Sequence, residues 1–197
     1  MSLPLILGLV IVSMLSGIAV TVFGYYTPFM ILASVLMAIG SGLLTTFETD
    51  TNSPKWIGYQ ALFGIGMGFG MQQPLVAVQA VLKTADVSVG TAIIIFSQTL
   101  GGALFISVGQ NIFTNQLIKH LTASLPDFDA STVLVVGATE LKHAIEERFL
   151  PGVLYAYNKT LTETFYASVA CAAFSVFGAL FVEWKNMKGK KIEMSAA

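Results

Sequence analysis

The chain has 197 residues, of which 55% are hydrophobic and 11% are charged, against about 25% charged residues in a typical soluble domain. This composition excludes a disordered chain, a coiled coil and an ordinary soluble enzyme, and it indicates an integral membrane protein. The formal net charge of −1 provides no basic surface to neutralise phosphates, so a nucleic-acid partner is not expected.

Apolar stretches long enough to cross a bilayer occur five times. A spanning helix needs about 20 apolar residues, because ~30 Å of hydrocarbon is covered at a rise of 1.5 Å per residue. We therefore predict an all-α integral membrane protein whose residues 1–197 form a single, incomplete membrane domain with five transmembrane helices in the lipid bilayer. The predicted spans are about residues 3–23, 28–47, 57–82, 89–114 and 161–184.

The third span is rich in glycine and glutamine. On a helical wheel, one wedge about 120° wide collects five small or amide residues: Gln60, Gly64, Gly68, Gln72 and Gln79. Gly66, Gly70 and Gln73 lie on the opposite side. Glycines four residues apart let helix backbones approach closely, so we expect close neighbours on two sides. Pro74 is expected to kink this helix, because it removes a backbone donor.

The fourth span repeats this pattern with an aromatic residue. Its stripe contains Thr91, Gln98, Gly102, Phe105 and Gly109. An aromatic ring among small and amide residues suits a site for flat, mostly apolar molecules. Our substrate-path candidates are therefore Gln60, Gln72, Gln98 and Phe105, and our helix-packing candidates are Gly64, Gly66, Gly68, Gly70, Gly102 and Gly109. In the alternative interpretation the amides only hydrogen-bond a neighbouring helix.

Residues 118–160 form the sizeable connection outside the bilayer. Apolar residues that recur every four positions predict a short amphipathic helix over 139–149: Leu141, Ile145 and Phe149. Residues 150–152, Leu-Pro-Gly, end it in this interpretation, and a new helix begins at Val153.

Basic residues near the ends of spans predict the orientation, because positive charge stays on the cytoplasmic side. We place the tail, residues 185–197, in the cytoplasm, since four lysines crowd it: Lys185, Lys188, Lys190 and Lys191. Five spans then put the N-terminus outside and make 118–160 an outer loop. Asn158 begins an Asn-Lys-Thr sequon on that side and is a glycosylation candidate.

Chemically reactive groups are scarce. The predicted first four spans contain no acidic, basic or histidine side chain, although ion-coupled pumps usually need such a group within the membrane. His120 and His143 are expected to be ordinary surface residues of the outer loop. The lone Cys171 can form no internal disulfide, and one thiol builds no zinc site. We predict no catalytic residues, no metal and no cofactor, and hence no enzyme.

Several motifs resemble the fungal drug:proton antiporters of the fourteen-span type, which belong to the major facilitator superfamily and include multidrug and mycotoxin efflux pumps. The resemblance lies in the glycine- and glutamine-rich segment 57–79 and in three shorter stretches, residues 3–7 with 24–29, 96–103 and 151–158. It covers nearly the whole chain, but only the last five spans of such a transporter. One departure concerns the superfamily's charged loop motif, which aligns with residues 17–26. The matching glycines are present, but uncharged residues replace the motif's charges: Thr21, Val22, Tyr25 and Tyr26.

This resemblance implies transmembrane transport. The chain would be the C-terminal portion of a proton-coupled exporter of drugs or toxic secondary metabolites, with a small amphipathic or apolar substrate. Its location would be the plasma membrane, with the vacuolar membrane as an alternative. A second hypothesis is a truncated or degenerate transporter fragment, or a small membrane partner protein with no transport activity of its own. Its partner would be the missing N-terminal half or a full-length relative.

Overall fold

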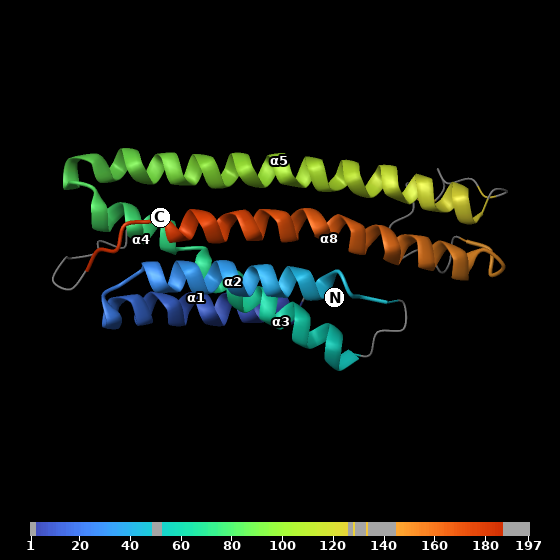
Figure 1. Ribbon diagram of the computed structural model, residues 1–197, viewed down its shortest axis with the longest axis horizontal. Coiled ribbons are helices and arrows are strands. Elements are labelled where there is room, and N and C mark those ends of the chain that lie inside the picture. The colour runs from blue at the N-terminus through green and yellow to red at the C-terminus, as the bar shows by residue number, and fades with distance from the viewer. Residues whose placement is uncertain (1–2, 49–52, 126–127, 129–132, 134–144, 187–197) are drawn as a thin grey trace.

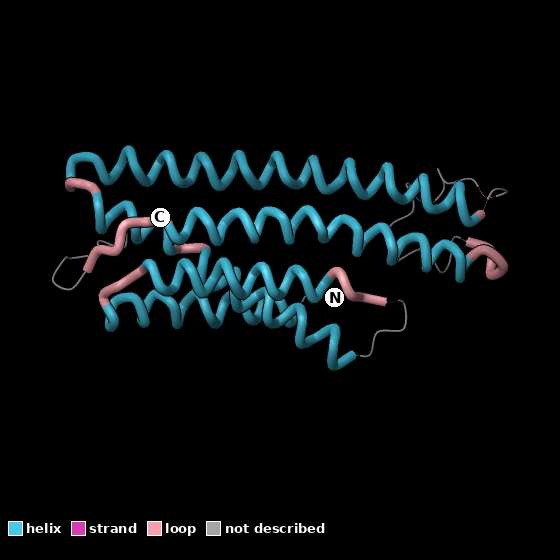
Figure 2. The backbone as a smooth tube through the Cα atoms, viewed as in Figure 1, coloured by secondary structure: helices cyan, strands magenta, loops and turns pink. Residues whose placement is uncertain are grey.

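The structure is a computed structural model, and it describes residues 3–48, 53–125, 128, 133 and 145–186. In these residues every regular element is a helix (Figures 1 and 2). The helices are α1 (Leu3–Phe23), α2 (Thr27–Leu44), α3 (Ser53–Gly70), α4 (Gln73–Val81), α5 (Thr84–Ser124) and α8 (Leu150–Leu180).

The helices lie roughly side by side, with their axes along one direction (Figure 1). Helix α3 packs against α1 and α2, α2 packs against α8, and α8 packs against α5. The short α4 contacts α5 and α2. Helix α5 therefore lies at one side of the bundle, where α8 and α4 are its main neighbours.

Five helical segments of the described chain are long and apolar enough to cross a membrane, with α3 and α4 together forming the third. Large apolar side chains are exposed along α1, α5 and α8; examples are Met14, Ile106 and Phe174, whose exposed fractions are 70%, 74% and 76%. Exposed apolar surface of this extent suits a hydrocarbon environment. The predicted all-α membrane fold is confirmed.

Helices α5 and α8 are longer than the spans predicted within them. The predicted fourth span is 89–114, but α5 covers 84–124. Helix α8 begins at Leu150, ahead of the predicted last span at 161 and three residues before the predicted helix start at Val153. The helical structure of α5 and α8 thus takes in residues 118–124 and 150–160, both assigned to the outer loop in the sequence analysis. A span predicted from a run of apolar residues ends at the first charged residue. An α-helix continues beyond it as long as its backbone hydrogen bonds can form.

The predicted amphipathic helix over 139–149 falls partly outside the described residues. Its described part, 145–149, is a turn rather than a helix, so that part of the prediction is wrong. Pro151, expected to help end a helix, lies in the first turn of α8. A proline is tolerated there because the first N–H groups of a helix have no intrahelical partner.

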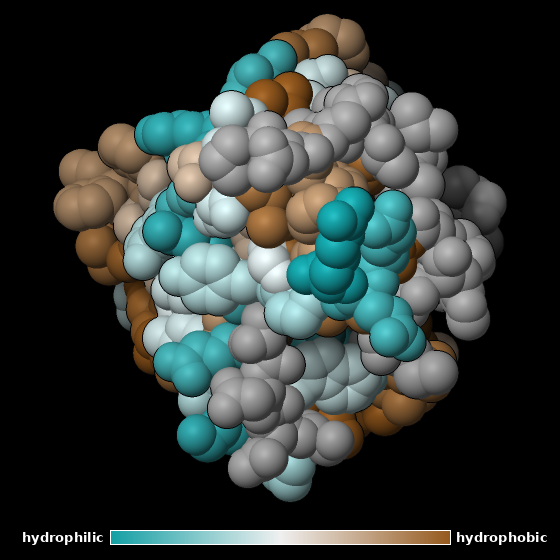
Figure 3. All heavy atoms as spheres, turned by 90° about the vertical axis from the view of Figure 1, so that its right-hand side faces the viewer, coloured by the Kyte–Doolittle hydropathy of each residue, from teal (hydrophilic) through white to brown (hydrophobic). Residues whose placement is uncertain are grey.

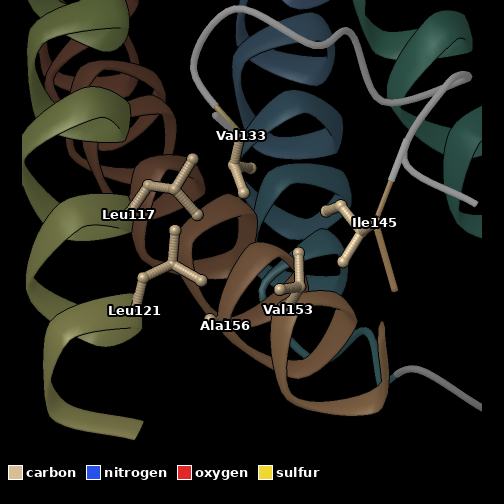
Figure 4. Packing of buried hydrophobic residues seen from close by; sticks show 6 residues of the cluster. All are labelled: Leu117, Leu121, Val133, Ile145, Val153 and Ala156. Atoms are coloured by element: carbon tan, nitrogen blue, oxygen red, sulfur yellow. The ribbon is translucent and has the colours of Figure 1, made fainter. Parts of the chain in front are cut away.

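The extended ends of α5 and α8 share a small hydrophobic core of their own (Figure 4). Leu117 and Leu121 of α5 face Val153 and Ala156 of α8, and Val133 and Ile145 of the connecting segment complete the cluster. The surface at this end of the molecule shows many hydrophilic residues, with hydrophobic ones along its margin (Figure 3). The end therefore combines a packed interior with a polar exterior.

The opposite end is closed by the turn between α1 and α2. Gly24 has a φ of 78°, a left-handed conformation that glycine adopts without steric cost. The turn brings Tyr26, which is fully buried, against the segment that follows α8. There the Tyr26 hydroxyl donates a hydrogen bond of 2.5 Å to the Glu183 carbonyl oxygen.

Candidate functional site

Helix α3 lets two neighbouring helices touch its backbone through its glycines. A Cβ atom at Gly64 would overlap the Leu5 carbonyl oxygen of α1, and one at Gly66 would lie 2.7 Å from the Met37 nitrogen of α2. The same two faces continue one turn further along, at Gly68 and Gly70. The polar residue Gln60, on the same helix, therefore lies within one or two turns of places where α3 touches the backbones of α1 and α2.

The third span is interrupted at Met71 and Gln72. The Met71 N–H donates to the Met67 carbonyl at the end of α3, and the Gln72 carbonyl accepts from the Val76 N–H at the start of α4. Pro74 lies in the first turn of α4, where its missing N–H ends the continuous helical ladder. The expected kink is therefore a full break between two helices.

One candidate residue reaches this break from another helix. The Gln98 amide nitrogen of α5 lies 3.4 Å from the Met71 carbonyl oxygen, to which it donates. Gln72, within the break, is exposed. The structure thus brings Gln98 to the same junction that contains Gln72.

The stripe on α5 is largely uncovered. Gln98 is exposed, and the exposed fraction of Phe105 is 56%. A Cβ atom at Gly102 would meet no atom within 4 Å, and one at Gly109 would only just touch Thr164 of α8, at 4.0 Å. The stripe therefore presents an amide and an aromatic ring beside open space.

Gln60 lies elsewhere, at a cavity of about 270 Å³ between α1, α2, α3 and α8. Phe47, Phe63 and Phe165 form much of its wall, together with Ser41 and Ser168. Gln60 and Gln98 do not share a site in the described structure. The junction that Gln98 reaches is 11 residues along from Gln60, about 16 Å at the rise of an α-helix.

Sequence reasoning did not single out Gln73. It is 1% exposed, and its amide nitrogen lies 3.2 Å from the Ser16 hydroxyl oxygen of α1. Among the described residues its side-chain oxygen has no hydrogen-bond partner, and neither does that of Gln79. A helical wheel drawn straight through residues 60–79 puts Gln73 on the side of Gly66 and Gly70, which face α2, whereas the structure places it against α1.

His120 is not an ordinary surface histidine. Its side chain is 16% exposed, and its Nε2 atom lies 2.9 Å from Glu163 Oε2. This contact joins the extended end of α5 to α8, just inside the start of the predicted last span. The prediction failed because residue 120 was assigned to a loop, whereas α5 continues to Ser124. His143 lies outside the described residues.

The glycosylation candidate lies inside a helix. The Asn158 side-chain nitrogen, the atom to which a glycan would be attached, donates a hydrogen bond of 2.9 Å to the Phe47 carbonyl. Thr160, the third residue of the sequon, is fully buried and bonds the Ala156 carbonyl of its own helix. In this conformation the sequon is engaged in packing α8 against the end of α2.

The part of the chain that the structure describes contains no candidate metal site. No three histidine, cysteine or acidic side chains gather there in a way that would hold a metal ion. The site candidates are therefore amides, hydroxyls and aromatic rings, which bind neutral or weakly polar molecules by hydrogen bonds and apolar contact.

Sequence comparison shows that this chain is similar to membrane transporters of the MFS type. The chain is 55% identical over 197 residues to "MFS-type efflux pump MFS1" of Arthroderma benhamiae, covering 100% of this chain and 37% of the relative. It is 50% identical over 192 residues to "MFS-type transporter astH" of Aspergillus oryzae, covering 98% of this chain and 34% of the relative. "Efflux pump roqT" of Penicillium rubens is 51% identical over 188 residues, which cover 95% of this chain and 35% of the relative.

The chain is thus homologous, over essentially all its residues, to part of the MFS-type efflux pumps, as the resemblance predicted. It spans about a third of the length of the curated relatives it matches. No family model matches the chain. No solved structure matches it either.

Proposed function

We propose that this chain forms part of a membrane exporter that removes drugs or toxic secondary metabolites from the cell in exchange for protons. Three similar proteins are named as efflux pumps or transporters of the MFS type. The five apolar helical segments supply the membrane-embedded scaffold that such a protein needs.

The observation that carries this proposal is the uncovered stripe on α5. Gln98 reaches the break between α3 and α4, and the half-exposed Phe105 lies two helical turns further along the same stripe. An amide beside an aromatic ring binds molecules that combine a flat apolar body with a few polar groups. We propose that Gln72, Gln98 and Phe105 line the substrate path, facing the part of the exporter that this chain does not include.

The proposed orientation places the tail in the cytoplasm and residues 125–149 outside. The membrane is proposed to be the plasma membrane, because a pump that clears toxic compounds from the cell must deliver them to the exterior. The supporting feature is the lysine-rich tail over residues 185–191, since positive charge favours the cytoplasmic side.

The direct test is an efflux assay on the whole exporter that contains this sequence, with a fluorescent amphipathic substrate. We expect Gln98→Leu to lower the rate about two- to tenfold, the range of one lost hydrogen bond. Gln110→Leu is the matched control, because Gln110 is exposed on the same helix but off the stripe. Equal loss in both variants would argue against a specific path along this stripe.

A second test measures water access. In a version of the whole exporter from which Cys171 and every other native cysteine have been removed, cysteine replaces Gln72 or Gln98, and the exporter is treated with a water-soluble thiol reagent. We expect both cysteines to react, and the substrate to slow the reaction. If both are inert, the proposed path does not pass these residues.

A further inference from the structure

An apolar groove lies at the end of the molecule that contains the turn between α1 and α2 (Figure 1). It has a volume of about 310 Å³ and is bordered by α2, α4, α5 and the segment after α8, through Met30, Ala77, Leu82, Ile94 and Val182 among others. It shares no lining residue with the cavity beside Gln60. No polar side chain lines the groove, so it suits a hydrocarbon chain.

The wall that the segment after α8 forms is held in place by hydrogen bonds. The Tyr26 hydroxyl donates to the Glu183 carbonyl oxygen, and the Thr27 hydroxyl lies 3.3 Å from the same oxygen. Glu183 directly follows Val182, which lines the groove. The groove is therefore formed before anything binds, so little conformational ordering opposes the binding of a chain in it.

Two lysines follow lining residues of the groove closely. Lys83 comes directly after Leu82, and Lys185 comes three residues after Val182. Lys83 is exposed and Lys185 is partly exposed. Neither lysine forms an ion pair with another described residue. Lysines in this position, beside apolar surface at the end of membrane helices, attract the phosphate of an anionic lipid.

The acidic side chains described near the groove do not outweigh these lysines. Asp86 lies in the first turn of α5, where the helix dipole stabilises a carboxylate, and Glu183 is exposed beside Val182. The sequence that follows, residues 186–197, adds three lysines and one glutamate. Positive charge therefore exceeds negative charge in the sequence around the groove, which favours an anionic partner.

Trp184 indicates that this end meets the boundary between hydrocarbon and headgroups. It lies between Glu183 and Lys185 in the sequence, and its exposed fraction is 62%, as suits a ring at the headgroup level of a bilayer. An anionic lipid at this level brings a phosphate for the lysines and an apolar chain for the groove in one molecule. A protein surface over the groove would have to supply both separately.

We propose that the groove is a binding site for an anionic phospholipid, with one acyl chain in the groove and the phosphate held by Lys83 and Lys185. The bound lipid joins α4 and α5 to the segment after α8. This inference does not depend on transport or on the proposed substrate path, because lipid binding is measured without any efflux.

The experiment uses two photoreactive lipids in phosphatidylcholine nanodiscs that hold the whole exporter containing this sequence. Phosphatidylglycerol and phosphatidylcholine each carry a diazirine in one acyl chain, so they differ only in the headgroup. After irradiation, mass spectrometry locates the labelled peptides. We expect saturable labelling around Ala77 and Val182. Phosphatidylglycerol should half-saturate at a mole fraction about five- to thirtyfold lower than phosphatidylcholine, because each lysine contributes about a factor of five.

Lysine variants test the contact with the phosphate. Lys83→Gln and Lys185→Gln should each lower the preference for phosphatidylglycerol about fivefold, and the double variant should remove it. Lys55→Gln is the control and should leave the preference intact, because Lys55 is exposed near the start of α3, at the other end of the bundle.

Tryptophan variants test the contact with the acyl chain. Ala77→Trp fills the groove and should abolish saturable labelling by both lipids. Ala85→Trp is the control, because Ala85 is exposed at the start of α5 and does not line the groove.

Each contrary outcome overturns the proposal. Labelling without saturation, spread over all helices, would mean ordinary contact with bulk lipid. Absence of labelling at the groove would mean that another part of the exporter covers it. Equal labelling by the two lipids in the unaltered exporter, or an unchanged preference in the double lysine variant, would mean that the headgroup is not recognised. The comparison of the two lipids on the unaltered exporter decides the case even if a variant fails to fold.

Discussion

Single side chains tie each end of the bundle to a main-chain carbonyl distant in sequence. At one end the Tyr26 hydroxyl bonds the Glu183 carbonyl, and at the other the Asn158 amide bonds the Phe47 carbonyl. Both bonds connect α8, or the segment after it, to the ends of α2. Since the hydrocarbon region supplies no competing water, such bonds at its margins stabilise the relative positions of these helices.

The first prediction concerns Tyr26. Tyr26→Phe keeps the ring but removes the donor, so it should lower the free energy of unfolding by about 1 kcal/mol. The loss is limited because Thr27 also lies within reach of the Glu183 carbonyl, at 3.3 Å. Thermal unfolding in nanodiscs measures it. Tyr25→Phe is the control, because Tyr25 is exposed and its bond to Asn186 is long, at 3.4 Å. An equal loss in both variants would contradict a specific role for Tyr26.

The same side chain predicts a dependence on pH. Burial raises the pKa of Tyr26 above its ordinary value of 10.0, and the negative charge of Glu183 raises it further. Above pH 10 the unfolded chain loses this proton while the folded chain retains it, so the contribution of Tyr26 is complete below pH 10 and is lost as the pH rises through the folded pKa. The stability advantage over Tyr26→Phe should be constant up to pH 10 and shrink above it. A constant advantage up to pH 12 would refute this account.

The third prediction is that Asn158 carries no glycan, because its amide nitrogen is engaged and Thr160 is buried. Digestion with an N-glycan-removing enzyme should leave the gel mobility of the chain unchanged. Asn158→Gln should migrate identically and serves as the reference. Asn158→Ala should also destabilise the protein by about 1 kcal/mol through the lost hydrogen bond. A mobility shift that depends on Asn158 would show that this end opens during synthesis.

At the residue scale, amide type and helical phase drew attention to α3 and α5, but they did not identify the partner of each amide. Gln60 faces a cavity, Gln72 is in the break, and Gln98 reaches the break from α5. These differences depend on which helix lies opposite each amide. The sequence alone does not show which helices become neighbours in the folded protein, so the surroundings of each amide could not be predicted from it.

At the scale of elements, α3 packs closely against α1 on one face and α2 on another. Its two glycine faces were predictable, because glycines four residues apart fall on one side of a helix. The structure places Gly64 and Gly68 against α1, and Gly66 and Gly70 against α2. Which helix takes which face was not predictable, since α1 and α2 are both mainly apolar with a few scattered hydroxyl residues.

The fourth prediction tests these contacts. Gly64→Ala places a methyl group against the Leu5 carbonyl, which belongs to backbone and cannot turn aside. We expect a loss of about 1–3 kcal/mol from overpacking. Gly58→Ala, on the same helix with nothing within 4 Å of the added atom, should instead stabilise by about 0.5–1 kcal/mol through helix propensity. Chemical unfolding of both variants measures the difference. Equal effects would mean that α1 does not approach α3 as closely as described.

At the scale of the whole molecule, one end projects beyond what membrane crossing requires. Helix α5 has 41 residues, about 60 Å at 1.5 Å per residue, against about 30 Å of hydrocarbon. Its final turns pack on α8 through Leu117 and Leu121 and through the contact between His120 and Glu163. Sequence analysis found the apolar spans but not this extension, because the extension is stabilised by contacts between segments more than 30 residues apart.

The proposed orientation predicts opposite chemical access at the two ends of the bundle. Asp86 is exposed at the start of α5, and Glu147 is exposed just before α8. In the whole exporter with Cys171 and every other native cysteine replaced, Glu147→Cys should react with a membrane-impermeant thiol reagent on intact cells. Asp86→Cys should react only after the membrane is permeabilised, because its end of the bundle also holds the segment leading to the lysine-rich tail. The reverse pattern would invert the topology and place the α5–α8 extension in the cytoplasm. Reaction of both cysteines on intact cells would mean that the α4–α5 turn is not sealed behind the bilayer.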